Sequence, residues 1–241
     1  MTVSVDLRRG AQRHLTTTSW LRSWQSFSYG DHYDPANTHH GVLMVCNEEI
    51  LAAGSGYDTH PHSNLEIVTW VLEGGLRHAD SLGNTAVIRA GQIGCLSAGA
   101  GVEHAEHADP ATGGVHFVQM AVLPDRPGGP PRYRQADVTA ALETGRLVTV
   151  ASGIAECPGA ITLGNRHAAL HVARLDAGAA VTLPTARYLY LQVIRGTVRV
   201  DNRTEMRAGD ALRFSDADGH TVRAPGAAEV LAWQMRAALG D

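Results

Sequence analysis

The chain has 241 residues, of which 44% are hydrophobic and 18% charged, and its formal net charge is −4. That composition describes a globular chain with a sizeable core, and without a basic run it gives no support for nucleic-acid binding through phosphate neutralisation. Three scattered cysteines, no signal-peptide pattern and no apolar run of about eighteen residues predict a cytoplasmic protein without disulfides or a membrane span.

The first forty residues show no clean periodicity, although 20–29 could form one or two strands. After them, short apolar and β-branched segments alternate with turns that contain glycine, which is typical of strands. We expect the clearest strands at 42–46, 65–72, 76–80, 93–97 and 115–123, with residues 48–54 leading into a loop. Turns every eight to twelve residues indicate an antiparallel β barrel or sandwich.

Residues 124–134 are rich in proline and glycine, so we expect a linker that cannot continue a sheet. A short helix could follow at 136–144, and a second series of strands begins near 146. This division predicts an N-terminal domain over 1–123, a linker with a short helix over 124–145, and a C-terminal domain over 146–241.

Two pairs of side chains have the residue types and the spacing of metal ligands. His60 and His62 flank Pro61, and His104 and Glu106 follow about forty residues later. Residues two apart lie on the same face of a strand, so the two pairs could surround one ion. Imidazole and carboxylate suit a divalent metal such as Fe, Mn, Ni, Co, Cu or Zn.

The second half of the chain repeats the pattern of the first. Residues 67–74 are echoed by 189–196, and Arg89-Ala90-Gly91 by Arg207-Ala208-Gly209. Superposing these turns places four residues without metal-ligand chemistry at the four candidate positions, namely Thr182, Pro184, Val222 and Ala224. We therefore expect two similar β domains, of which only the first has the site. The remaining histidines considered are interpreted as core or surface residues: His39, His40, His78, His116, His167, His171 and His220.

The chain resembles the pirin family of the cupin superfamily. The residues that carry the resemblance are Gly54, His60-Pro61-His62, Glu73-Gly74-Gly75 and the segment from Ser97 to Glu106, which reads SAGAGVEHAE. The resemblance covers most of 20–135 and, more faintly, the second half. It implies an all-β bicupin, with two antiparallel β-barrel (jelly-roll) domains in one chain and a metal in the N-terminal barrel only.

The resemblance also implies that His60, His62, His104 and Glu106 hold one divalent transition metal per chain, with iron as the first expectation. Bacterial pirins are associated with quercetin 2,3-dioxygenase activity, which implies a metal-dependent dioxygenase acting on a small aromatic substrate and dioxygen, with Glu106 as the catalytic base. Eukaryotic relatives are associated with transcriptional regulation, so the alternative is a metal-binding regulatory module with a protein partner. Ser63 and Asn64 depart from many relatives and leave the substrate open.

The sequence pattern alone leaves two choices of metal ligand undecided. Glu103 and His107 would share the opposite strand face from His104 and Glu106, and periodicity does not say which face is inward. The match to the family favours His104 and Glu106. Glu66, four residues after His62, is the rival carboxylate, because a glutamate often follows the two histidines at this distance in cupins.

Overall fold

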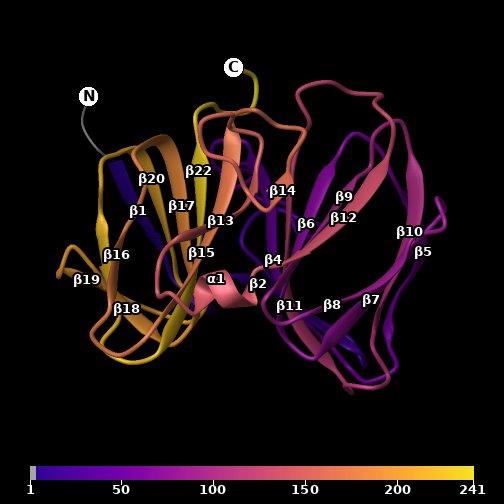
Figure 1. Ribbon diagram of the computed structural model, residues 1–241, viewed down its shortest axis with the longest axis horizontal. Coiled ribbons are helices and arrows are strands. Elements are labelled where there is room, and N and C mark those ends of the chain that lie inside the picture. Colours follow the sequence, from indigo (N-terminus) through magenta and orange to yellow (C-terminus); the bar gives the residue numbers. More distant parts are fainter. Residues whose placement is uncertain (1–3) are drawn as a thin grey trace.

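A computed structural model describes residues 4–241 as two β-rich halves that lie side by side (Figure 1). Each half packs a seven-stranded sheet against a four-stranded one in a jelly-roll-like arrangement, which confirms the all-β prediction. The helical elements are short, namely the 3₁₀ turn η1 (Gly10–Gln12) and the helix α1 (Thr139–Leu142). No helix between residues 4 and 241 is long and apolar enough to span a membrane.

The N-terminal half contains the first pair of sheets. Its large sheet has the spatial order β12 (Arg132–Asp137), β9 (Gln92–Ser97), β6 (Glu66–Glu73), β11 (Val115–Val122), β4 (Leu43–Leu51), β3 (Leu21–Gln25) and β2 (His14–Thr17). Its small sheet has the order β5 (Gly56–His62), β10 (Val102–Ala108), β7 (Gly75–Asp80) and β8 (Thr85–Arg89). All of these neighbours are antiparallel.

The C-terminal half repeats this plan. Its large sheet has the order β1 (Ser4–Arg8), β20 (Ala211–Ala217), β17 (Ala186–Arg195), β22 (Ala228–Met235), β15 (Ala168–Leu175), β13 (Val148–Ser152) and β14 (Ile161–Thr162). Its small sheet has the order β16 (Ala180–Thr182), β21 (Thr221–Arg223), β18 (Thr197–Val200) and β19 (Thr204–Arg207). One pair in the described chain, β13 with β14, is parallel.

The predicted internal repeat is confirmed strand by strand. The eight strands from β4 to β11 occupy the same places in their sheets as the eight from β15 to β22. The turns that anchored the repeat are also alike, since Gly74 has a φ of 76° and Gly196 one of 75°. A Cβ atom at either glycine would overlap a backbone oxygen of the neighbouring strand, that of Gly114 or of Ala227. Both positions therefore require glycine for conformation and for space.

The first strand in each half of the sequence joins the large sheet that is built mainly from the other half. β1 precedes the N-terminal sheets in the chain but adds to β20, from Ser4 opposite Ser215 to Arg8 opposite Ala211. β12 precedes the C-terminal strands but adds to β9. Figure 1 shows the indigo β1 among orange and yellow strands, and β12 among purple ones. The two halves thus exchange their first strands reciprocally.

Several predicted boundaries are corrected by the structure. The expectation that 124–134 cannot continue a sheet is wrong at its end, because β12 begins at Arg132, where the prolines have ended and every residue can donate a backbone N–H. The helix expected at 136–144 is reduced to Thr139–Leu142. The strand expected at 42–46 continues to Leu51, because buried Glu49 is satisfied by neighbouring hydroxyls rather than by solvent.

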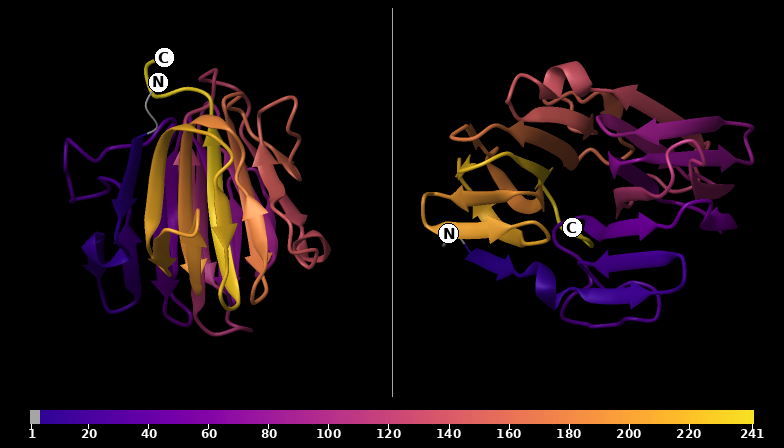
Figure 2. Two further views of the ribbon diagram at one scale, coloured as in Figure 1. Left: turned by 90° about the vertical axis from the view of Figure 1, so that its left-hand side faces the viewer. Right: turned by 90° about the horizontal axis from the view of Figure 1, so that it is seen from below.

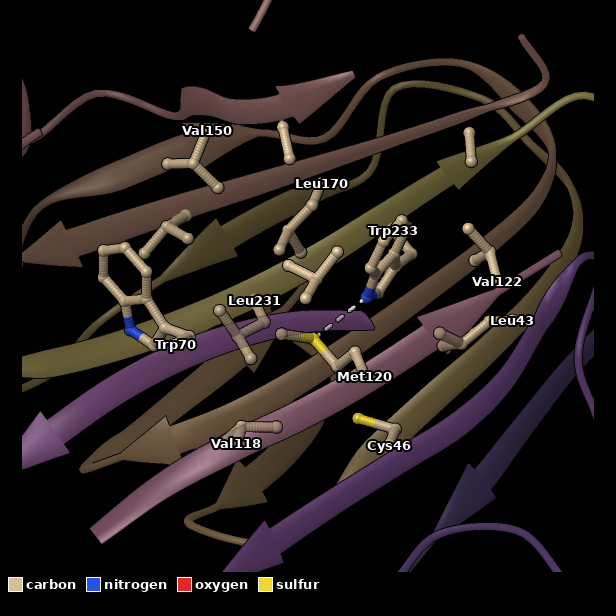
Figure 3. Close-up of a cluster of buried hydrophobic side chains, with 14 of the residues drawn as sticks. Leu43, Cys46, Trp70, Val118, Met120, Val122, Val150, Leu170, Leu231 and Trp233 are labelled. Atoms are coloured by element: carbon tan, nitrogen blue, oxygen red, sulfur yellow. Dashed lines mark hydrogen bonds between the residues drawn. The ribbon is translucent and has the colours of Figure 1, made fainter. Parts of the chain in front are cut away.

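The largest core lies between the two halves, where the large sheets face each other (Figure 2). Alternate residues of β6 show the arrangement, because Val68, Trp70 and Leu72 belong to this shared core while Val71 belongs to a core within the N-terminal half. Figure 3 shows Trp233 donating its indole N–H to the sulfur of Met120 across this core, at 3.1 Å. Burial on both faces explains the nearly continuous hydrophobic sequence of β6.

The interiors of the two halves differ in polarity. The space between the C-terminal sheets is filled by aliphatic and aromatic side chains, such as Leu189, Leu191 and Phe214. The corresponding N-terminal interior contains several buried polar side chains, namely Glu49, His78, His104 and Glu106. Burying polar groups costs free energy unless they are paired, so this interior calls for a functional explanation.

Candidate metal centre

Strands β5 and β10 bring the predicted histidines together. His60 and His62 lie on one face of β5, and His104 of β10 is directly opposite His60 in the strand register. The ring centroids of His60 and His104 are 4.4 Å apart, and those of His62 and His104 are 5.0 Å apart. One ligand atom from each of the three rings lies within 4.8 Å of the others. The structure therefore brings three of the four predicted residues together, namely His60, His62 and His104.

His104 is the buried member of this cluster, with a relative exposure of 2%. Both of its ring nitrogens are buried and have no hydrogen-bond partner among the described residues. His60 has a different arrangement, because its Nδ1 lies 2.7 Å from the backbone oxygen of Asp58. A carbonyl oxygen only accepts, so Nδ1 donates this hydrogen bond and Nε2 is the ring nitrogen of His60 left for a metal.

Glu106 lies two residues beyond His104 on β10 and is also buried. A register shift against β5 separates the two residues, and Glu106 faces His78 of β7. Gln119 of β11 donates its side-chain amide to Oε2 of Glu106 at 2.7 Å. Ligand atoms of His78, His104 and Glu106 also lie within 4.8 Å of one another. Glu106 is thus next to the histidine cluster through His104.

The electrostatics of the cluster follow from burial. Burial raises the pKa of Glu106 to about 7, against the lowering effect of the Gln119 hydrogen bond and with a further increase from nearby Glu49. Burial also lowers the pKa of His104 to about 3, and the neighbouring histidines add to this effect. The pKa of His62 is lowered for the same reasons. The rings of His62 and His104 are therefore held neutral, each with one lone pair available, beside a carboxylate that lacks a cationic partner.

This donor set fits a divalent metal ion. Neutral imidazoles and a carboxylate are ligands for borderline divalent metals. A cation would accept the lone pair of the unprotonated ring nitrogen of His104, which has no other partner among the described residues, and would offset the negative charge of Glu106. The hydrogen bond from His60 to the Asp58 backbone is the kind of outer contact that orients a ligating histidine.

The alternative ligands that the sequence left open, Glu103, His107 and Glu66, lie outside both groups of possible metal ligands within residues 4–241. Glu103 and His107 point to the outer side of the small sheet, where His107 approaches Asp58. Glu66 is buried, but it binds Ser97 and the backbone of Gly164 and belongs to neither group of possible metal ligands within residues 4–241. The same is true of the other histidines set aside as scaffold or surface, namely His39, His40, His116, His167, His171 and His220.

Two further side chains lie beside the predicted ligands, namely His78 and Gln119. His78 has the hydrogen-bonded role expected of it, because its Nε2 is 3.1 Å from Asp80, and it also lies within reach of His104 and Glu106. Gln119 stands alone in an apolar strand, so no spacing marks it. The internal repeat does mark it. Gln119 pairs with Thr69 in the first copy, and the equivalent pair in the second copy is Ala232 with Leu191, so the glutamine is replaced by alanine where the site is absent.

Comparison with known proteins agrees with the geometry. The family model described as Pirin matches residues 8–122, and one described as quercetinase C-terminal cupin domain matches 158–235. A protein of Mycobacterium tuberculosis is 51% identical over 241 residues, which is 100% of this chain and 99% of its own. The Escherichia coli protein named quercetin 2,3-dioxygenase is 30% identical over 232 residues, covering 96% of this chain and 98% of its own.

A solved structure extends the likeness to three dimensions. The crystal structure of the bacterial pirin YhhW from Escherichia coli in complex with nickel(II) matches with a TM-score of 0.88 and 30% identity, covering 97% of this chain and all of the other. The similarity therefore includes both halves and both sheets of each half, as the predicted bicupin fold requires. The chain belongs to the pirin family of the cupin superfamily.

Proposed function

We propose that this protein is a metal-dependent dioxygenase of flavonol-type substrates such as quercetin, with one divalent metal held by His60, His62, His104 and Glu106. The observation that carries the proposal is the pair of buried, unpartnered nitrogens of His104 between His60, His62 and a buried carboxylate. Two relatives support it through their names, one a quercetin 2,3-dioxygenase and the other a pirin in complex with nickel(II).

Each residue of the site has a separate role in the proposed reaction. A bound divalent metal would supply Lewis acidity and a place where substrate and dioxygen are held together. Gln119 occupies Oε2 of Glu106, which leaves Oε1 to accept the proton of the flavonol hydroxyl. The backbone oxygen of Asp58 fixes the ring of His60. In the proposed reaction both atoms of dioxygen stay in the ring-opened product, and one ring carbon leaves as carbon monoxide.

The test is turnover of quercetin under air by protein whose metal content has been measured. We expect one divalent ion per chain, consumption of dioxygen and release of carbon monoxide. Glu106→Gln should lower the rate by about 10²–10⁴-fold, since an amide cannot accept the proton. His60→Ala should lose metal and activity together.

Glu103→Gln is the matched control, because Glu103 lies on the same strand but on its exposed outer face. It should retain both metal and activity. If the fully loaded protein leaves flavonols untouched, the dioxygenase proposal fails for this substrate class. The metal-binding regulatory module with a protein partner is then the better account.

A further inference from the structure

A cavity of about 440 Å³ lies where the two halves meet. Glu66 and Ser97 line it from the N-terminal half, and Gly164 and Arg166 line it from the C-terminal half. Its rim is formed by the segment that connects the halves, including Asp125, Arg126 and Arg132. It shares no residue with the histidine cluster.

A buried carboxylate with one unused oxygen faces this cavity. Glu66 has a relative exposure of 3%. Its Oε2 accepts hydrogen bonds from the hydroxyl of Ser97 and from the backbone N–H of Gly164, both at 2.9 Å. Its Oε1 accepts none from residues 4–241, and a Cβ atom on Gly164 would lie 2.8 Å from that oxygen. Glu66 lines the cavity and Oε1 is its oxygen without a hydrogen bond, so Oε1 is the acceptor that a ligand in the cavity can use.

Three guanidinium groups surround the same cavity. Arg126, Arg132 and Arg166 are exposed, and within the described chain none of them forms a salt bridge. Asp125, the acidic residue of the rim, uses Oδ2 to accept the backbone N–H of Arg166 at 2.9 Å. Three positive charges thus stand against the two carboxylates of Glu66 and Asp125. Arginine forks are suited to planar, bidentate binding of carboxylates.

We propose that this cavity binds a small hydroxycarboxylate. The hydroxyl of the ligand donates to Oε1 of Glu66, and its carboxylates pair with the arginines of the rim. Glu66 and Ser97 come from one half and Gly164 and Arg166 from the other, so the ligand joins the two halves. The site is independent of the proposed dioxygenase reaction, because none of its residues belongs to the metal cluster.

The probes are malate and succinate, which have the same two carboxylates but differ in the hydroxyl. Calorimetric titration of the full chain should show malate binding, and succinate should bind about 10-fold more weakly or worse. Arg132→Gln and Arg166→Gln should each weaken malate binding by about 10-fold. Arg203→Gln is the matched control, since Arg203 is also exposed and without a salt bridge but lies between β18 and β19.

Two further variants test the hydroxyl contact and the independence of this cavity from the metal centre. Glu66→Gln should reduce the preference for malate over succinate, while the loss of one negative charge should strengthen the binding of succinate. His60→Ala, which cannot hold the metal as the wild type does, should bind malate normally, because the ligand does not use the metal centre. The proposal is overturned if malate gives no heat at millimolar concentration, if both ligands bind alike, or if neither rim arginine matters. Loss of malate binding in His60→Ala would also overturn it.

Discussion

Gln119 fixes the orientation of the buried carboxylate of Glu106, and its equivalent in the second copy is alanine. Glu49 is likewise replaced by alanine in the second copy. It pairs with Phe117, and the equivalent pair is Ala173 with Val230. The second half therefore lacks the supporting polar side chains as well as the four candidate ligands. The interior of the C-terminal half is apolar, and it folds in the same way without these side chains. The polar residues inside the N-terminal half therefore serve the site rather than the fold.

Gln119→Leu tests this role of a supporting residue. The variant removes the hydrogen bond to Glu106 but keeps an apolar side chain of similar size. We expect metal affinity to fall by about 10–100-fold, as is typical when an outer contact to a ligand is lost. The measurement is competition with a chelator followed by elemental analysis. Gln135→Leu on the exposed edge strand β12 is the control, and an equal loss in both variants would contradict the assignment.

His40 links the halves through a hydrogen bond from its Nε2 to the backbone oxygen of Phe214, at 3.1 Å. Burial, with the charge of Arg213, lowers the pKa of His40 to about 4. The unfolded chain therefore binds a proton that the folded chain excludes between about pH 6.5 and pH 4. Protonation of His40 in the unfolded chain therefore lowers the free energy of unfolding. The loss is absent above about pH 6.5 and grows as the pH falls towards 4.

His40→Gln should remove that pH dependence. Between about pH 7.5 and pH 5, the wild-type protein should lose about 1–2 kcal/mol more unfolding free energy than the variant. Urea unfolding of both proteins at the two pH values measures the difference. Parallel losses in the two proteins would show that His40 titrates alike in the folded and unfolded chains.

Among the elements, the sequence predicted strands that have a clear period and missed strands that do not. β5 and β6 were expected because they show same-face histidines or continuous β-branched and aromatic residues. β1 and β2 were missed because they are edge strands of five and four residues, so the alternation of Val5 and Leu7 with polar residues in β1 is too short to be distinctive. The pairing of β1 with β20 spans about the whole chain, and no local pattern records a partner at that distance.

Gly56 sets how closely β5 approaches β10. A Cβ atom at this position would overlap the backbone oxygen of Glu106 and contact His107, so Gly56→Ala must push the strands apart. We expect loss of metal occupancy and a destabilisation of about 1–3 kcal/mol. Thermal unfolding and elemental analysis of the variant provide the measurements. Gly226→Ala, where a Cβ atom meets nothing within 4 Å, should change neither, and a Gly56→Ala protein with full occupancy would refute this account.

At the scale of the molecule, the two halves are joined by more than their connecting segment. They share the largest core, and each seven-stranded sheet is completed by the first strand of the other half of the sequence. Polar contacts reinforce the exchange, since Arg9 pairs with Asp210 at 2.8 Å and the backbone N–H of Gly10 donates to the same side chain. Neither half is therefore expected to be a complete folding unit.

Deleting residues 1–8 tests the exchange. The deletion removes β1 at the very start of the chain, yet it should expose the edge of β20, more than two hundred residues away. Amide hydrogen exchange should accelerate at Ala211–Ala217 and stay unchanged at Gln92–Ser97, whose partner β12 is intact. Faster exchange confined to β2 and β3 would mean that the first residues belong to their own half.

The reciprocal exchange of first strands also bears on how such a chain could arise and persist. Two copies of a single-domain ancestor that swapped their first strands would form the same sheets, and fusing them through the segment at 124–131 would give the present chain. After fusion, the duplicate that lost its ligands could not be discarded, because β12 at its start closes the sheet beside the remaining site. This architectural role of β12 is sufficient to favour retention of the second half, independently of any ligand that it helps to bind.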